Sequence, residues 1–272
     1  MTGITKEIAL WIETIRPEAI EDGTRGVVSG LIDSVLTTTG KQWGNTRPDP
    51  APSGADPCGY AYALASGLRA DPLPDQHAPL MDLAAPVVGA SLATAAHHRC
   101  SGASLGASIV AGCELGLMLA ELAGAGAPLL FAPLAAPAAA AAAARVLDLR
   151  SDQLVSAVGI GVSSTVGAAV TTDVAWQAGK SASNGVLAAL LASEGFTGPP
   201  DAIEHPRGLL GAVFNVGSAE GKATFGNRIA AMGPLVASAR PDPDIGAEVA
   251  GLWELERADA LITAAVPDWR RP

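Results

Sequence analysis

The chain has 272 residues, of which 49% are apolar, 16% charged and only 4% aromatic, and its formal net charge is −10. The apolar share is ample for a buried core and excludes a disordered chain. The acidic balance argues against nucleic acid or an anionic membrane as a partner, because both are bound by clustered Lys and Arg. The mean hydropathy of +0.31 comes from Ala and Gly rather than from Leu and Phe, which predicts closely packed helices and no membrane span.

Two features indicate a cytoplasmic protein. The first residues contain no basic leader followed by an apolar segment, so we expect no secretory signal. The three cysteines, Cys58, Cys100 and Cys113, are odd in number and lack CxxC spacing. Reduced thiols therefore fit better than a disulfide framework.

Apolar residues recur at helical spacing along most of the chain. The first predicted helix, 4–15, has Ile8 and Ile12 on its apolar stripe and ends before Pro17. Further helices are predicted for 18–38, 61–68, 83–97, 104–122, 135–149, 151–166 and 180–194, with loops at 42–57 and 71–77. Ser104 and Ser151 stand where N-caps are expected. No alternating run predicts a strand, so the predicted class is all-α.

The most apolar stretch, 128–149, contains an unbroken run of alanines over 138–144. Alanine contributes little transfer free energy, and Pro133 and Pro137 interrupt the stretch. We therefore expect a helix buried within a bundle rather than a membrane span.

Glycines repeat inside several predicted helices. An interior glycine costs about 0.5–1 kcal/mol relative to alanine, so this repeated use predicts close contact between helix backbones. The chain has no GxGxxG after a strand and no GxxxxGK[ST], so no nucleotide cofactor is predicted. The glycines concerned are Gly102, Gly106, Gly112, Gly116, Gly159, Gly161, Gly179 and Gly185.

Four segments, in this order and spacing over about the first 215 residues, resemble the MmgE/PrpD family, which includes 2-methylcitrate dehydratase, cis-aconitate decarboxylase and iminodisuccinate epimerase. They are the opening pair of helices, the segment 107–116, the alanine-rich helix with 145–149 after it, and the segment 179–199 with its Ser183-Asn184-Gly185 step. The resemblance implies an all-helical core domain, which in the family carries a smaller α+β lid inserted before the last helices.

The chain is too short to contain that lid, so the resemblance predicts a lidless, all-α member of the family. We expect a helical core over 1–214, a short bridge over 215–243 in place of the lid, and a C-terminal helix over 244–272 that returns to the core. A homodimer is expected, because loss of a lid exposes surface and helices of small residues pair readily.

The family's catalytic positions, carried over residue by residue, hold different residues here. Asp71 stands at the histidine of the family's NGxxxHxxDFDD segment, and Asp75 or His77 replaces its acidic pair. These residues are interpreted either as a repurposed acid–base cluster or as part of a solvated, Pro-rich loop.

Apolar residues occupy most of the other family positions. Leu129 and Phe131 take the histidine and threonine of GFHxT, and Val174 and Gln177 take the lysine and histidine of TKxxHxG. The family chemistry needs a positioned base and cations for an anionic substrate. The changes therefore disfavour hydration or decarboxylation of a tricarboxylate and favour a mostly apolar substrate.

Nearby polar and aromatic residues complete the predicted site. Lys180 follows the family lysine position by about one turn; facing inward it would need a carboxylate or anionic ligand beside it, and surface exposure fits equally well. Trp176 is interpreted as a loop residue. Its ring either forms a surface on which a ligand stacks or fills a junction between helices. The predicted catalytic residues are Asp71, Asp75, His77, Asp173, Gln177 and Lys180, and the predicted substrate-binding residues are Leu129, Phe131, Thr172, Val174 and Trp176.

His97 and His205 are expected to have structural rather than catalytic roles. His97 at a helix end is expected to satisfy last-turn carbonyls, and His205 is interpreted as an ordinary loop residue. No pair of histidines has metal-ligand spacing, so no metal is predicted.

Three functional hypotheses follow. The leading one is a cofactor-independent biosynthetic enzyme that isomerises or cyclises an apolar, polyketide-like small molecule, with pericyclic ring closure among the reactions that fit. The second retains the family's lyase or epimerase chemistry on a carboxylate, with Asp71, Asp75, His77 and Lys180 as substitutes. The third is a non-catalytic protein that binds a ligand or stabilises a partner.

Overall fold

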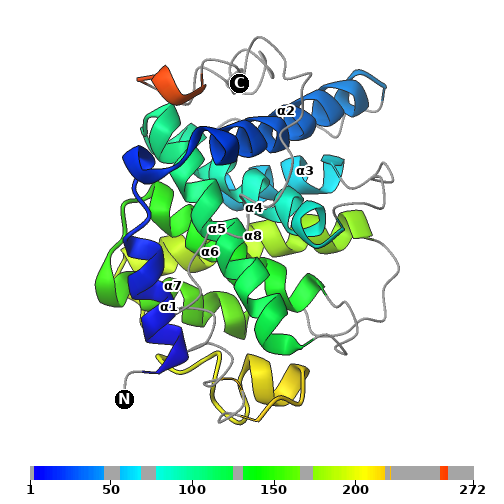
Figure 1. The fold of residues 1–272 in the computed structure, drawn as a ribbon. Helices are drawn as coiled ribbons and strands as arrows, with labels where there is room; N and C mark the ends of the chain where they lie inside the picture. The colour runs from blue at the N-terminus through cyan, green and yellow to red at the C-terminus, as the bar shows by residue number, and fades with distance from the viewer. Residues whose placement is uncertain are drawn as a thin grey trace.

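The chain folds as a bundle of α-helices (Figure 1). A computed structural model describes residues 3–45, 56–68, 78–124, 131–165, 174–217, 221 and 252–256, with the backbone alone at 34–45, 68, 78–82 and 131–132. These residues contain no strand, which confirms the all-α class. The helices are α1 Ile4–Glu13, α2 Asp22–Asn45, α3 Pro57–Leu68, α4 Ala78–His97, α5 Gly102–Ala123, α6 Phe131–Val146, α7 Ser151–Ser163 and α8 Val174–Ser193.

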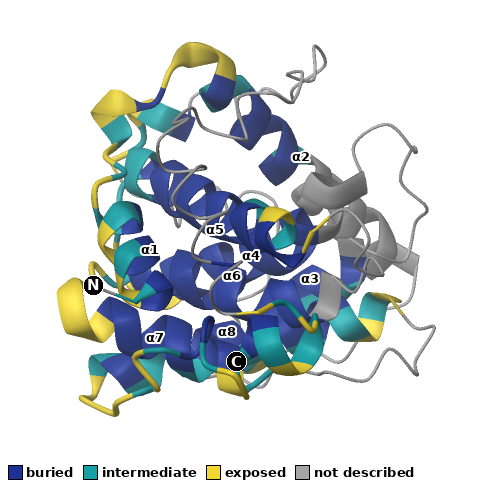
Figure 2. Cartoon of the chain, turned by 60° about the horizontal axis from the view of Figure 1, so that its bottom comes forward, coloured by how far each residue is buried: buried dark blue, intermediate teal, exposed yellow. Residues whose placement is uncertain are grey.

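The alanine-rich helix α6 lies at the centre of the bundle. It packs against α4, α5, α7 and α8, and every alanine from 138 to 144 is fully buried. Figure 2 shows the buried helices together in the interior, with exposed residues confined to the outer helices and turns. Small side chains are required at this centre because four helices approach one axis.

Close contacts at the glycines confirm the prediction of backbone-to-backbone packing. A Cβ on Gly185 would lie 2.5 Å from Ala139 Cβ, where α8 crosses α6. A Cβ on Gly112 would lie 2.8 Å from the Ala138 carbonyl oxygen, where α5 crosses α6. Both distances are too short for a real side chain, so alanine at either position would force the helices apart.

The helix α5 is long and apolar enough to cross a bilayer by length and composition alone. Its most apolar window has a mean hydropathy of 1.6, but 78% of that window is buried inside the bundle. Burial of this kind is typical of a core helix of a globular domain, since its apolar surface is already covered by protein.

Several predicted helix limits differ from the structure. The N-cap of α5 is Ser101 rather than Ser104, because the Ser101 side chain accepts a hydrogen bond from the Ser104 amide at 3.1 Å. Ser151 is the first residue of α7 rather than its cap, which is Arg150 without a side-chain bond.

Helix α6 starts at Phe131, earlier than the predicted start at residue 135, and contains both prolines of this stretch. Pro133 lies in the first turn, where the missing N–H is not needed. Helix α2 reaches Asn45 and α8 begins at Val174, so both extend into predicted loops.

The described part of the C-terminal region covers α5. Leu252–Glu254 forms one 3-10 turn, and the Gly102 amide donates to the Leu255 carbonyl at 2.8 Å. The Trp253 ring lies against Gly106 and stacks with the Arg25 guanidinium, 5.3 Å from the ring centroid. The rest of the predicted bridge and of the helix over 244–272 lies almost wholly outside the described residues, so this division of the chain stays a prediction.

Candidate functional site

The start of α8 lies against α3. Asp56 caps α3, since its carboxylate accepts hydrogen bonds from the amides of Cys58 (3.1 Å) and Gly59 (3.2 Å). On α8, a Cβ on Gly179 would lie 2.9 Å from both the ring and the carbonyl oxygen of Tyr62. This close crossing fixes the first two turns of α8 relative to the N-terminus of α3.

Burial and the neighbouring Asp56 raise the pKa of the Cys58 thiol at this junction. The pKa of Cys58 is raised to about 12, chiefly by burial and then by the charge and hydrogen bond of Asp56, while the Lys180 ammonium acts in the opposite direction. Lys180, which is half-buried, therefore lies within electrostatic reach of this thiol. A thiol with this pKa is neutral at physiological pH and cannot serve as a nucleophile there.

Four of the predicted site residues occupy the first two turns of α8. Val174 and Trp176 are 42% and 39% exposed, although both are large and apolar. Gln177 and Lys180 are half-buried and three residues apart, so they share one face of the helix. Trp176 was interpreted as a loop residue, and the structure corrects this by placing it on the helix.

The remaining predicted site residues are not placed. Phe131 is the first residue of α6, where only the backbone is described. The others lie outside the described residues, so the predicted cluster around the family's catalytic positions stays a prediction. These are Asp71, Asp75, His77, Leu129, Thr172 and Asp173.

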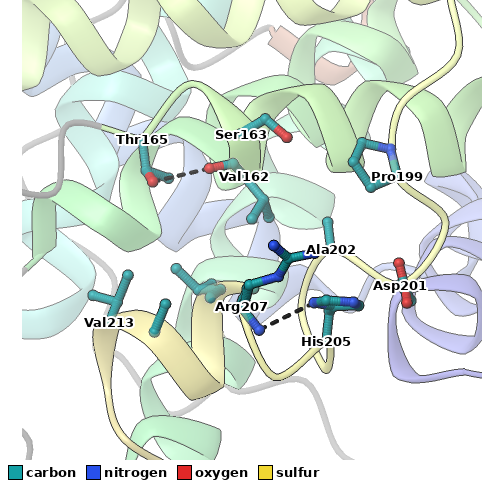
Figure 3. A pocket seen from close by; sticks show the side chains of 12 residues that line it. Val162, Ser163, Thr165, Pro199, Asp201, Ala202, His205, Arg207 and Val213 are labelled. Atoms are coloured by element: carbon teal, nitrogen blue, oxygen red, sulfur yellow. Dashed lines mark hydrogen bonds between the residues drawn. The ribbon is translucent and has the colours of Figure 1, made fainter.

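A cavity of about 440 Å³ lies between the end of α7 and the segment 199–213 (Figure 3). Its volume is within the range of small-molecule sites. Its polar lining comes from Ser163, Thr165, Asp201, His205 and Arg207, and its apolar lining includes Val162, Pro199, Leu209 and Val213.

Sequence reasoning missed this cavity. His205 was interpreted as an ordinary loop residue, whereas the structure places it in the cavity wall beside Arg207. The available signal was four charged or titratable residues within the seven positions 201–207, in a Pro- and Gly-containing turn, and such turns are more often simply solvated. Nothing in the sequence shows that α7 ends against this turn.

Metal ligation has no support in the described part of the chain, where no three His, Cys, Asp or Glu side chains come together.

His97 was predicted to bond to a carbonyl in the last turn of its helix, and this is confirmed. Its Nδ1 lies 2.9 Å from the Ala93 carbonyl oxygen in the last turn of α4.

The described residues form an all-α domain whose central helices pack through Ala and Gly. A family model described as the MmgE/PrpD N-terminal domain matches residues 61–221, more than half of the chain. The chain therefore belongs to the MmgE/PrpD family, as the sequence resemblance predicted. Members of this family are usually enzymes, dehydratases among them. No individual curated protein matches the chain significantly.

Proposed function

We propose that this chain is a cofactor-independent biosynthetic enzyme that isomerises or cyclises an apolar, polyketide-like small molecule at the N-terminal end of α8. The observation that carries the proposal is the exposure of Val174 and Trp176 on the same two turns as the half-buried Lys180. Trp176 and Lys180 are four residues apart and share one face of α8, so an apolar ring and a cation lie on the same side there, an arrangement that suits a ligand with an apolar body and one polar group.

The chemistry of this helix end suits a substrate with one polar group. The Lys180 ammonium would donate a hydrogen bond to a substrate carbonyl and stabilise the enolate that forms when a neighbouring C–H proton leaves. The same proton would return to another carbon, so neither water nor carbon dioxide is lost. Asp173 is the proposed base, and Gln177 would orient the carbonyl. A pericyclic ring closure would need only a surface that holds the reactive conformer.

Product mass tests this proposal. The purified protein is incubated separately with a panel of conjugated polyene ketones, with 2-methylcitrate and with cis-aconitate, and the products are analysed by liquid chromatography and mass spectrometry. We expect a product of unchanged mass from the polyene panel and none from the two carboxylates. Lys180→Met should lower kcat by about 10²-fold, whereas Lys6→Met, at an exposed position on α1, should not change it.

The same experiment separates the alternatives. A product that has lost water or carbon dioxide would favour the family's lyase chemistry, with which the family membership is compatible. An inverted stereocentre in a recovered carboxylate would favour epimerisation. Binding without any product would favour a non-catalytic role. Full turnover in the Lys180→Met variant would contradict the role proposed for this lysine.

We also propose that the protein acts as a cytoplasmic homodimer. Two exposed apolar side chains support the dimer, since a partner subunit would cover them. They are Leu187 on α8, which is 47% exposed, and Phe196 just after α8, which is 60% exposed. A monomeric mass by light scattering at micromolar concentration would contradict the dimer.

A further inference from the structure

The cavity beside α7 contains two opposite charges that do not pair with each other. Asp201 and Arg207 both line it, yet neither side chain makes a hydrogen bond or ion pair with any described residue. Figure 3 shows the Arg207 guanidinium reaching into the cavity, while Asp201 lies on the far side of His205. Both charges therefore remain available to a ligand.

The backbone of the turn 201–208 holds these charges apart. The His205 amide donates to the Asp201 carbonyl at 2.8 Å, and the Gly208 amide donates to the His205 carbonyl at 2.7 Å. The Arg207 amide donates to His205 Nδ1 at 3.0 Å. A ring nitrogen that accepts a hydrogen bond carries no proton, so the neutral imidazole presents an N–H at Nε2.

The remaining polar groups are acceptors. The hydroxyls of Ser163 and Thr165 each donate to a carbonyl of α7 at 2.9 Å, to Gly159 and Val162 respectively. Their oxygen lone pairs remain free to accept a further hydrogen bond. The cavity thus offers a guanidinium for an anion and a carboxylate for a cation, and the two hydroxyl oxygens elsewhere in its wall are further acceptors.

We propose that this cavity binds a free α-amino acid with an aliphatic side chain. Arg207 binds the carboxylate through its planar guanidinium, and Asp201 binds the ammonium. The apolar lining of Val162, Leu209 and Val213 contacts the side chain. The site shares no residue with the α8 site, and the proposal does not depend on the function proposed there.

Three probes test this on the wild-type protein by isothermal titration calorimetry. They are L-leucine, 4-methylpentanoate, which is leucine without its amine, and 3-methylbutylamine, which is leucine without its carboxylate. We expect leucine to bind, and each truncated probe to bind about tenfold more weakly or worse, since each loses one charge-assisted contact. No measurable binding of leucine, or equal binding of leucine and 4-methylpentanoate, would overturn the proposal.

Two variants assign the contacts. Arg207→Gln should weaken leucine about tenfold and leave 3-methylbutylamine unchanged, and Asp201→Asn should weaken leucine about tenfold and leave 4-methylpentanoate unchanged. Arg99→Gln, at an exposed arginine after α4, is the matched control and should bind leucine as the wild type does. Unchanged leucine binding in Arg207→Gln, with a wild-type helical circular dichroism spectrum, would contradict the assignment.

Discussion

The carboxylate of Glu204 accepts two hydrogen bonds from Thr5, a residue 199 positions earlier in the chain. One comes from the Thr5 amide at 3.1 Å and one from its hydroxyl at 2.6 Å. The same hydroxyl accepts a hydrogen bond from the Ile203 amide at 3.0 Å, and both side chains are buried. The first turn of α1 is thereby joined to the turn that walls the cavity.

Replacement of Glu204 should destabilise the protein. Glu204→Ala leaves the Thr5 amide and hydroxyl buried without their acceptor, so we expect the free energy of unfolding to fall by about 2 kcal/mol. Chemical denaturation measures this. Glu194→Ala, at an exposed glutamate just after α8, is the control and should change stability by less than about 0.5 kcal/mol. Equal effects of the two variants would contradict a structural role for the Thr5 contact.

The helix crossing at Gly185 should not tolerate a methyl group. The Cβ of Gly185→Ala would lie 2.7 Å from the Ala139 carbonyl carbon and from the Ala140 nitrogen, which are backbone atoms and cannot rotate away. We expect a loss of about 1–3 kcal/mol in thermal or chemical unfolding.

Gly23→Ala is the control for this crossing. Gly23 lies in the first turn of α2 with nothing within 4 Å of its Cβ position. This variant should be neutral or more stable by up to about 1 kcal/mol, because alanine favours the helix. A Gly185→Ala variant as stable as Gly23→Ala would contradict the close crossing.

The Cys58 thiol should react slowly with iodoacetamide at pH 8, because its pKa is raised to about 12 and the thiolate is the reactive form. Asp56→Asn removes a negative charge that disfavours the thiolate, so it should lower this pKa and speed alkylation. Lys180→Met removes a stabilising positive charge and should slow alkylation further. Peptide mapping by mass spectrometry measures the rates at Cys58, and an opposite order of the two variants would contradict the arrangement.

Stability should fall in alkaline solution. The pKa of the Cys58 thiol is raised from an ordinary value of 9.0 to about 12, chiefly by burial and further by Asp56, and burial also raises the pKa of Tyr60 and of Cys113. In the unfolded chain these groups lose their protons at lower pH than in the folded one. The contribution of Cys58 is therefore fully present below pH 9 and is lost as pH rises toward about 12.

Thermal unfolding between about pH 8 and pH 11 measures this effect. The melting temperature should decrease across the range, and Cys58→Ser should decrease less steeply than the wild type, because serine does not ionise there. A melting temperature that stays constant to the upper end of the range would contradict the raised pKa values.

Several elements of the fold follow from local sequence. Ile8 and Ile12 place one stripe of α1 in the core, and both are fully buried. The close crossings at Gly112 and Gly185 follow from glycine placed inside helices. The helix ends are less predictable: Ser101 and Ser104 are both good caps, and their hydrogen bonds depend on where the preceding chain enters the helix.

The site could be predicted less well. The sequence grouped Gln177 and Lys180 only through the family resemblance, because its predicted helix began at Lys180; the structure places both on one face of α8. The proximity of Lys180 to Cys58 depends on the crossing of α8 with α3 at Gly179, which no local pattern specifies. The prediction that Trp176 lies in a loop is wrong because helix formation extends through a segment with no clear starting signal.

Helical class, the small-residue core and family membership were determined by the sequence itself, because helical periodicity and family motifs involve residues close together in the chain. Only the tertiary structure brought Thr5 to Glu204 and placed the end of α7 against Asp201, His205 and Arg207. These contacts join residues far apart in sequence, and their formation depends on the packing of the whole bundle. The physical reason is that local propensity sets which helices form, whereas the shape of the packed core sets which side chains meet.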